Sequence, residues 1–136
     1  MSDKIDNILK ESKNIAVVGI SNKLGRPSLT VGSYLTGQGY NVIPVNPMYE
    51  DVNGVKCYPD LESIPDKVDV VDIFRKPADV PPIVESAIKI GAKTVWMQES
   101  IVNEDAAKLA EEKGLNVVMD KCMLKEHSRY KKSQQQ

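Results

Sequence analysis

Short apolar-rich runs alternate with amphipathic segments along the chain. Runs of this length and composition favour strands that are buried within a sheet. Five of them occur, at residues 15–18, 41–45, 68–73, 93–97 and 115–119. Between these runs, apolar residues recur at helical spacing. The clearest helical face carries Val80, Ile83, Val84, Ala87 and Ile88. The pattern therefore predicts strands and helices in alternation.

Residues that favour helix starts mark several of these segments. Ser2, Asp79 and Asn103 each precede an amphipathic stretch, and their side chains are suited to cap it. A short strand or ribbon is expected over 54–58, and a helical turn over 60–64. Helices are expected after Ser2, over 28–38, 80–90 and 103–113, and near 124–130.

Strands that alternate with helices predict one fold class. We expect a Rossmann-like, doubly wound α/β domain, with a five-stranded, mainly parallel sheet and helices on both faces. The domain is expected to span 1–130 and to be followed by a polar, disordered tail over 131–136. Pro44 is difficult to place, because the second strand should be central and proline cannot donate a ladder hydrogen bond there. Either Pro44 lies at the end of its strand or the ladder is interrupted.

Composition narrows the classes of partner. The 136 residues suffice for one domain, and 41% of them are hydrophobic. A net charge of -1 with 27% charged residues argues against binding to nucleic acid or to an anionic membrane. No apolar run approaches the length of a membrane span and the N-terminus lacks a signal-sequence pattern, so a cytoplasmic protein is expected. Cys57 and Cys122 are interpreted as free thiols of a reducing compartment.

Residues 15–28 carry the most informative pattern. A buried strand ends at Gly19, a short loop follows, and a helix begins near Ser28. Such a strand–loop–helix presents backbone N–H groups and the positive end of a helix to an anion. Arg26, Pro27 and Ser28 add a guanidinium, a rigid turn and a hydroxyl, which suit a phosphate or pyrophosphate. The alternative is that Ser28 caps the helix and Arg26 is a solvated loop charge.

The same loop departs from the dinucleotide-binding fingerprint. Counting from Gly19, the second and third glycine positions hold Ser21 and Leu24. The acidic residue that would bind the ribose of NAD after the second strand is replaced by the neutral Asn46. NADP is less excluded, because Arg26 could meet its extra phosphate. An NADP-dependent oxidoreductase therefore stays open as the alternative function.

The end of the third strand supplies a second group suited to a nucleotide. Phe74, Arg75 and Lys76 join the one phenylalanine of the chain to two cations. An aromatic ring and an arginine can flank an adenine while a cation meets a phosphate. Ligands of open parallel sheets lie against the carboxyl ends of the strands, which makes these residues candidates for the same ligand. The alternative is a surface loop of ordinary charge.

Candidate reacting groups do not form a catalytic set. Asp69 and Asp72 are expected on opposite faces of their strand because their offset is odd. Cys122 would need an activating base, and the one histidine, His127, lies in a polar stretch where a solvated side chain is expected. The cysteines and the histidine lack metal-ligand spacing. The sequence therefore favours a binding protein over an enzyme.

Five segments in order resemble a known family. They are 17–28 (Val-Val-Gly-Ile-Ser, then Arg-Pro-Ser), 42–47 (Val-Ile-Pro-Val-Asn-Pro), 68–77 (Val-Asp-Val-Val-Asp-Ile-Phe-Arg-Lys-Pro), 91–98 (Gly-Ala-Lys-Thr-Val-Trp-Met-Gln) and 117–122 (Val-Val-Met-Asp-Lys-Cys). On these motifs the chain resembles the small stand-alone CoA-binding domain proteins, which are similar to the CoA-binding domain of the succinyl-CoA synthetase α subunit. The resemblance covers about residues 10–125.

The resemblance implies a Rossmann-type domain that binds coenzyme A, or an acyl-CoA, non-covalently through four strand ends. The implied contacts are Gly19, Ile20 and Ser21 through their backbone, Arg26, Pro27 and Ser28 at the phosphates, Asn46 and Pro47 beside the cleft, Phe74, Arg75 and Lys76 at the adenine or 3′-phosphate end, and Met97 and Gln98 at the floor. The synthetases transfer phosphate through a histidine on a separate domain, and His127 does not inherit that role. A third hypothesis is a mixed disulfide between Cys122 and CoA.

Overall fold

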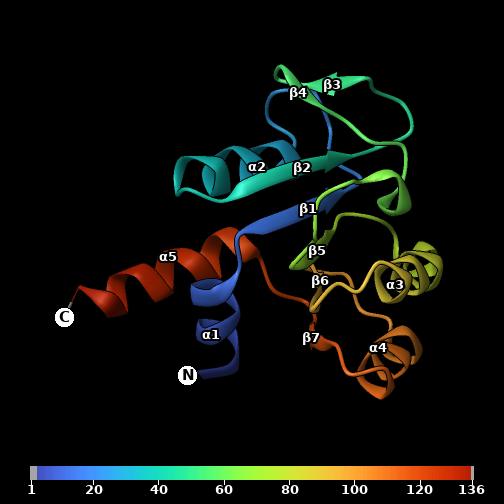
Figure 1. Ribbon diagram of the computed structural model, residues 1–136. Coiled ribbons are helices and arrows are strands. Elements are labelled where there is room, and N and C mark those ends of the chain that lie inside the picture. The colour runs from blue at the N-terminus through green and yellow to red at the C-terminus, as the bar shows by residue number, and fades with distance from the viewer. Residues whose placement is uncertain (1–2, 136) are drawn as a thin grey trace.

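The computed structural model describes residues 3–135 and has an α/β architecture (Figure 1). The main strands are β1 (Asn14–Val18), β2 (Asn41–Val45), β5 (Val70–Ile73), β6 (Thr94–Met97) and β7 (Asn116–Val118). The α-helices are α1 (Asp3–Glu11), α2 (Pro27–Gly37), α3 (Val80–Lys89), α4 (Glu104–Glu112) and α5 (Met123–Gln134). Short elements are the hairpin strands β3 (Asp51–Val52) and β4 (Val55–Lys56) and the 3-10 helices η1 (Leu61–Ser63) and η2 (Pro77–Asp79).

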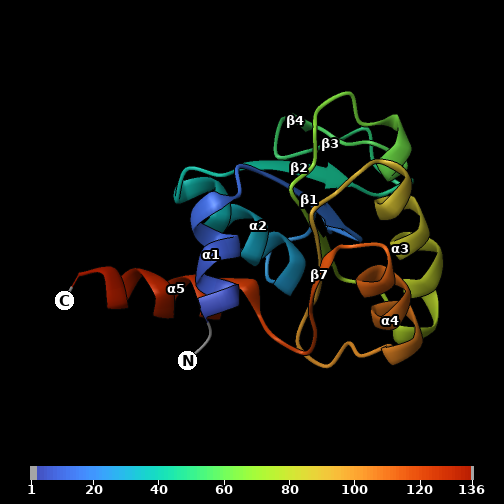
Figure 2. The same cartoon turned by 60° about the horizontal axis from the view of Figure 1, so that its bottom comes forward.

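The main sheet has the strand order β2-β1-β5-β6-β7, and all of its strands are parallel. Helices α1, α2 and α5 cover one face and α3 and α4 cover the other (Figure 1, Figure 2). The predicted Rossmann-like fold class is thereby confirmed. Strands β1 and β5 are neighbours, yet the helices that follow them pack on opposite faces of the sheet. This arrangement opens a crevice at the carboxyl ends of the two strands.

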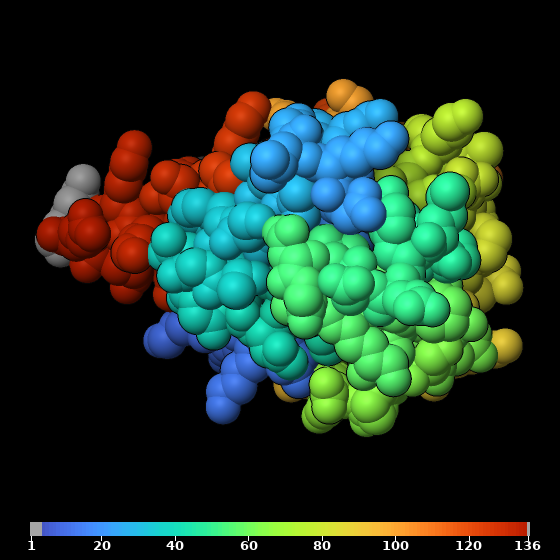
Figure 3. Space-filling view, turned by 90° about the horizontal axis from the view of Figure 1, so that it is seen from above, coloured from blue at the N-terminus to red at the C-terminus, as the bar shows by residue number. Residues whose placement is uncertain are grey.

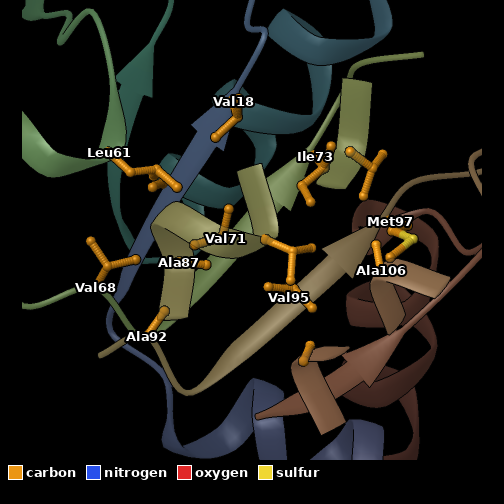
Figure 4. Packing of buried hydrophobic residues seen from close by; sticks show 14 of the residues in the cluster. Val18, Leu61, Val68, Val71, Ile73, Ala87, Ala92, Val95, Met97 and Ala106 are labelled. Carbon is orange, nitrogen blue, oxygen red and sulfur yellow. The ribbon is translucent and has the colours of Figure 1, made fainter. Parts of the chain in front are cut away.

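Apolar layers on both faces of the sheet make up the core. One layer lies beneath α3 and α4 and contains Val71, Val95 and Met97 (Figure 4). The other lies beneath α1, α2 and α5 and contains Trp96, whose indole N–H donates to the Lys121 carbonyl over 2.8 Å. Because both faces are covered, the strands are apolar in continuous runs rather than in alternation.

The position of Pro44 corrects one expectation about the sheet. The second strand was expected to be central, but β2 lies at an edge of the main sheet. Val45 accepts from the Gly19 N–H on the β1 side, so the backbone of Pro44 points away from the sheet. There the Pro44 carbonyl accepts from the Tyr58 N–H over 3.0 Å. The missing donor of Pro44 therefore removes no hydrogen bond from the ladder.

Helix starts agree with the pattern at one position and differ at another. The Asn103 side chain accepts from the Ala106 N–H over 3.0 Å, which confirms the predicted cap of α4. Asp79 does not cap α3 through its side chain, because the second and third residues of the helix, Pro81 and Pro82, have no N–H to donate. Its carboxylate pairs with Arg75 instead. Ser2, the expected cap of the first helix, lies outside the described residues.

The C-terminal segment is more regular than expected. Helix α5 continues to Gln134 through most of the stretch for which an unpacked tail was expected. Its Lys131 ammonium donates to the Gln38 side-chain oxygen over 2.8 Å, although the segment stays exposed. Within residues 3–135, no helix combines the length and the apolar character needed to cross a membrane.

Candidate functional site

A two-part cleft lies at the carboxyl ends of β1, β2 and β5. One part is a hollow of about 220 Å³, which we call the apolar hollow, and it is lined by Val18, Gly19, Val45, Pro47, Pro59, Asp60, Leu61, Arg75, Pro82, Ile83 and Ser86. The other is an open hollow of about 500 Å³, lined by Gly19, Asn46, Pro47, Met48, Phe74, Arg75 and Lys76. Gly19, Pro47 and Arg75 line both, so the two hollows adjoin.

Gly19 is the point at which the β1 and β5 ends approach each other. Its φ is +87°, and a β-carbon there would lie 2.5 Å from the Phe74 carbonyl oxygen and 2.8 Å from Arg75 Cδ. Its N–H donates to the Val45 carbonyl over 2.9 Å. Only glycine combines this conformation with this close contact. The stem of Arg75 consequently rests on the backbone at Gly19.

Two serines hold the loop after β1, Ser21 within the loop and Ser28 in the first turn of α2. The Ser28 hydroxyl is buried and accepts from the Ser21 N–H over 2.9 Å, and the Ser21 hydroxyl accepts from the Lys23 N–H over 3.0 Å. Pro27 opens α2, and Arg26 before it is exposed and provides no side-chain cap. The loop thus presents the Arg26 guanidinium to solvent beside the first turn of α2. The side chains of Ser21 and Ser28, by contrast, accept hydrogen bonds from backbone N–H groups of the loop.

Asn46 joins the loops that follow β1 and β2. Its Nδ2 donates to the Ile20 carbonyl and its Oδ1 accepts from the Met48 N–H, both over 2.9 Å. Figure 3 shows the loop after β1, in light blue, against the segment after β2, in blue-green. A carboxylate could not donate to Ile20, which explains an amide at this position. Both polar atoms of the Asn46 amide form hydrogen bonds within the protein. In an NAD-binding domain, an acidic residue at the corresponding position binds the ribose of the ligand.

The loop after β5 brings an aromatic ring and two cations to the cleft. Phe74 is half-buried and its N–H donates to the Val18 carbonyl over 2.9 Å. Arg75 and Lys76 are exposed and line the open hollow. Arg75 Nη2 donates to Asp79 Oδ2 over 3.1 Å. The side of the cleft formed by this loop is therefore basic.

Met97 and Gln98 were expected at the floor of the cleft, but both side chains are buried inside the protein. Met97 is 0% exposed and belongs to the core beneath α3 and α4. Gln98 is buried, and its side-chain oxygen accepts from the Met123 N–H over 3.1 Å at the start of α5. Their side chains thus serve packing and the anchoring of α5. Six of the thirteen residues expected in the site line the open hollow, namely Gly19, Asn46, Pro47, Phe74, Arg75 and Lys76.

From the sequence, Leu61, Pro82 and Ile83 were not predicted to line a hollow. Leu61 comes from η1, and Pro82 and Ile83 come from the first turn of α3. The hydrophobic pattern accounts for Leu61 and Ile83 as core positions and for Pro82 as a helix start, so it carries no signal of a binding surface. Their convergence depends on the chain passing around the edge of β2 before it enters β5.

His127 and Cys57 serve the structure, whereas Cys122, the candidate thiol, is half-buried. His127 is 6% exposed rather than solvated, and its Nδ1 lies 2.9 Å from the Tyr34 hydroxyl. Burial, with the nearby charge of Lys131, lowers the pKa of His127 below its ordinary value. The Cys57 thiol is buried and lies 3.5 Å from the Asn46 carbonyl, and burial raises its pKa. Over residues 3–135, no three histidine, cysteine or acidic side chains gather as metal ligands would.

Asp72 is an uncompensated acid inside the fold. It lies between Val17 and Trp96 in the sheet and is 0% exposed. Its two carboxylate oxygens have no hydrogen-bond partner within the described part of the chain. Burial therefore raises the pKa of Asp72 well above its ordinary value, which favours the protonated form.

Comparisons with known proteins identify relatives over most of the chain. The Bacillus subtilis protein YneT is 38% identical over 125 residues, which cover 92% of this chain and 93% of YneT. Acetate–CoA ligase [ADP-forming] II of Archaeoglobus fulgidus is 32% identical over 101 residues, which cover 73% of this chain and 15% of the ligase.

Solved structures agree with these relatives. A protein from Pyrococcus horikoshii has a TM-score of 0.92 and 49% identity, with 96% of this chain and 92% of that chain covered. A Thermus thermophilus protein has a TM-score of 0.91 and 33% identity, with 96% and 99% covered. Residues 13–128 match the family described as a CoA binding domain. The chain therefore belongs to the CoA-binding domain family and is related to the matching region of the ADP-forming ligases.

Proposed function

We propose that this protein binds coenzyme A, free or acylated, across the carboxyl ends of β1, β2 and β5, and that the chain by itself performs no chemistry on it. The observation that carries the proposal is the cleft at Gly19, where a basic open hollow adjoins an apolar one. Family membership supports CoA as the ligand. The names of the archaeal ligases fit the same ligand.

The chemistry of the cleft suits the two kinds of surface that CoA carries. Its phosphates are assigned to Arg26 at the first turn of α2 and to Arg75 and Lys76, because guanidinium and ammonium groups bind phosphate through charge-assisted hydrogen bonds. Phe74 is assigned to the adenine or 3′-phosphate end. The apolar hollow beside Leu61 would take a less polar part of the ligand.

Binding without catalysis is favoured by the state of the reacting groups. His127 is engaged by Tyr34, and the Cys57 thiol contacts a backbone carbonyl. Asp72 lies inside the core and not on the cleft surface. A general base or nucleophile has to reach the ligand, and these three groups point into the protein. Cys122, the thiol of the mixed-disulfide hypothesis, is half-buried and needs a separate test.

Calorimetric titration with CoA tests the proposal. Saturable binding of CoA, with NADPH titrated in parallel and bound more weakly, is the expected result. Tighter binding of NADPH than of CoA would favour the NADP-dependent oxidoreductase. A folded protein that gives no signal at millimolar CoA would contradict the proposal. Intact mass after incubation with oxidised CoA tests the mixed disulfide at Cys122 separately.

A further inference from the structure

Arg75 lies between the two hollows and is held at one end. Its side chain lines both hollows. Its Cδ lies so close to Gly19 that a β-carbon there would come within 2.8 Å. Its Nη2 donates to Asp79 Oδ2 over 3.1 Å, at the end of η2. The stem is therefore fixed over the β1 end, while the charged group is drawn to the start of α3.

The ion pair between Arg75 and Asp79 can be exchanged. The two side chains are 45% and 43% exposed, and ion pairs in contact with water contribute little stability. The contact to Asp79 runs through Nη2, and a guanidinium has five N–H donors. A phosphate can engage two of them in parallel, which is a stronger interaction than a single contact.

We propose that Asp79 is a specificity-determining residue, which keeps Arg75 in an internal ion pair until a ligand brings a phosphate together with further contacts in the cleft. The inference rests on the proposed function, and it adds that the Asp79 carboxylate competes with the ligand phosphate for Arg75. A small anion has to displace the carboxylate with no other contact to offset the loss. A ligand that also occupies the hollows on either side of Arg75 offsets that loss by its other contacts.

The position of Asp79 distinguishes it from other acids near the cleft. Asp60 lines the apolar hollow, but its carboxylate is bound to the Ser63 N–H over 2.8 Å and caps η1. Asp79 has no such role, because it does not cap α3 with its side chain. Its carboxylate is directed to the one cation that both hollows share.

A double-mutant cycle tests the inference by calorimetric titration with CoA. The four proteins are wild type, Asp79→Asn, Arg75→Ala and the double variant. We expect Asp79→Asn to bind CoA about three- to tenfold more tightly, because the carboxylate that competes with phosphate for the Arg75 guanidinium is removed. In the Arg75→Ala background the same change should alter affinity less than twofold. Pantetheine, which lacks phosphate, should bind wild type and Asp79→Asn equally.

Matched controls separate this effect from general charge and from folding. Glu85→Gln removes one negative charge from an exposed position of α3 and should leave CoA affinity within twofold of wild type. Asp79→Ser is the second variant if Asp79→Asn is unstable, since it also removes the carboxylate that pairs with Arg75.

Two results would overturn the inference. One is CoA affinity that stays unchanged or falls in the folded Asp79 variants, and the other is a gain that persists in full without Arg75. Either result would leave CoA binding by the wild type intact. If the wild type itself does not bind CoA, the proposed function fails, and that failure is distinguishable from both results.

Discussion

The side chain of Asn46 donates a hydrogen bond to the carbonyl oxygen of Ile20 over 2.9 Å, which ties the end of β2 to the loop after β1. Asn46→Asp should break this tie, because a carboxylate only accepts hydrogen bonds and would face the carbonyl oxygen. We expect the free energy of unfolding to fall by about 1–3 kcal/mol and CoA to bind more weakly. Urea unfolding and calorimetric titration measure the two effects.

The same change at an exposed hairpin position provides the control for Asn46. Asn53 lies between β3 and β4 and is exposed, so Asn53→Asp should leave both quantities near wild type. Equal behaviour of the two variants would mean that the amide of Asn46 does not couple the loops.

Gly19→Ala should damage the cleft where two strand ends meet. Its β-carbon would lie 2.5 Å from the Phe74 carbonyl oxygen, and its φ of +87° is strained for any other residue. We expect a loss of about 1–3 kcal/mol in the free energy of unfolding, together with weaker CoA binding because the Arg75 stem is displaced. Gly37→Ala is the control: it lies in α2 with nothing within 4 Å of the added carbon, and should not destabilise the protein. A stable Gly19→Ala protein with normal affinity would refute the close contact.

Arg26→Ala tests the phosphate assignment at the first turn of α2. The loss of a charge-assisted contact to a phosphate should weaken CoA binding by about 1.5–3 kcal/mol. Stability should stay near wild type, since Arg26 is exposed and its side chain caps nothing. Lys108→Ala removes an exposed cation from α4 and should bind CoA as the wild type does. Unchanged affinity in Arg26→Ala would mean that the phosphates of CoA bind to other residues.

His127 should make stability depend on pH. Burial, with Lys131 nearby, lowers its pKa in the folded protein, while the unfolded chain keeps the ordinary value near 6.5. The unfolded state therefore takes up the proton first as pH falls. The free energy of unfolding should stay level above about pH 6.5 and decrease below it, by at most about 1.4 kcal/mol per pH unit. In His127→Gln this part of the dependence should vanish, as urea unfolding across this range would measure. An unchanged slope would show that His127 is not the group responsible.

Asp72 should destabilise the protein in the opposite pH direction. Its pKa is raised in the folded state, so the folded protein holds a proton that the unfolded chain releases above its ordinary pKa near 3.8. Stability contributed by this group is lost as pH rises from that value towards the folded pKa. Asp72→Asn, which is neutral and of similar shape, should gain on the order of 1–3 kcal/mol at pH 8 relative to wild type. The gain should shrink near pH 4, and a gain that is equal at both pH values would argue against an ionisable Asp72.

Local pattern predicted the five strands of the main sheet, the presence of the five α-helices and the class of fold. The spacing of Val80, Ile83 and Val84 predicts α3, and Asn103 predicts the start of α4, because each signal lies within a few residues of its effect. The position of β2 at the edge was not predictable in this way, since strand order depends on contacts far apart in the sequence. A proline within a strand favours an edge position. Pro44 was not predicted to mark an edge, because the second strand was expected to be central.

Side-chain environments were predicted less well than elements. His127 was expected in solvent because its neighbours in sequence are polar, yet Tyr34 and Tyr40 from the α2 region surround it. Met97 is the last residue of β6, at the strand end where a ligand contact would lie, but it faces α3 and α4 and lies in the core. Both differences arise because a residue's face on its element, and what covers that face, are decided by tertiary packing.

Tyr58 affects whether a second molecule can add a strand to the edge of the sheet at β2. Its backbone N–H and C=O engage the Pro44 carbonyl and the Asn46 N–H, over 3.0 and 2.9 Å, along the outer side of β2. An edge strand with free backbone groups is a template on which another chain can add a strand and begin to aggregate. Here the hydrogen-bonding sites around Pro44 are already taken by the protein's own chain, and proline offers no donor to an incoming strand. The loop that shapes the cleft thus also protects this border of the sheet against strand addition between molecules.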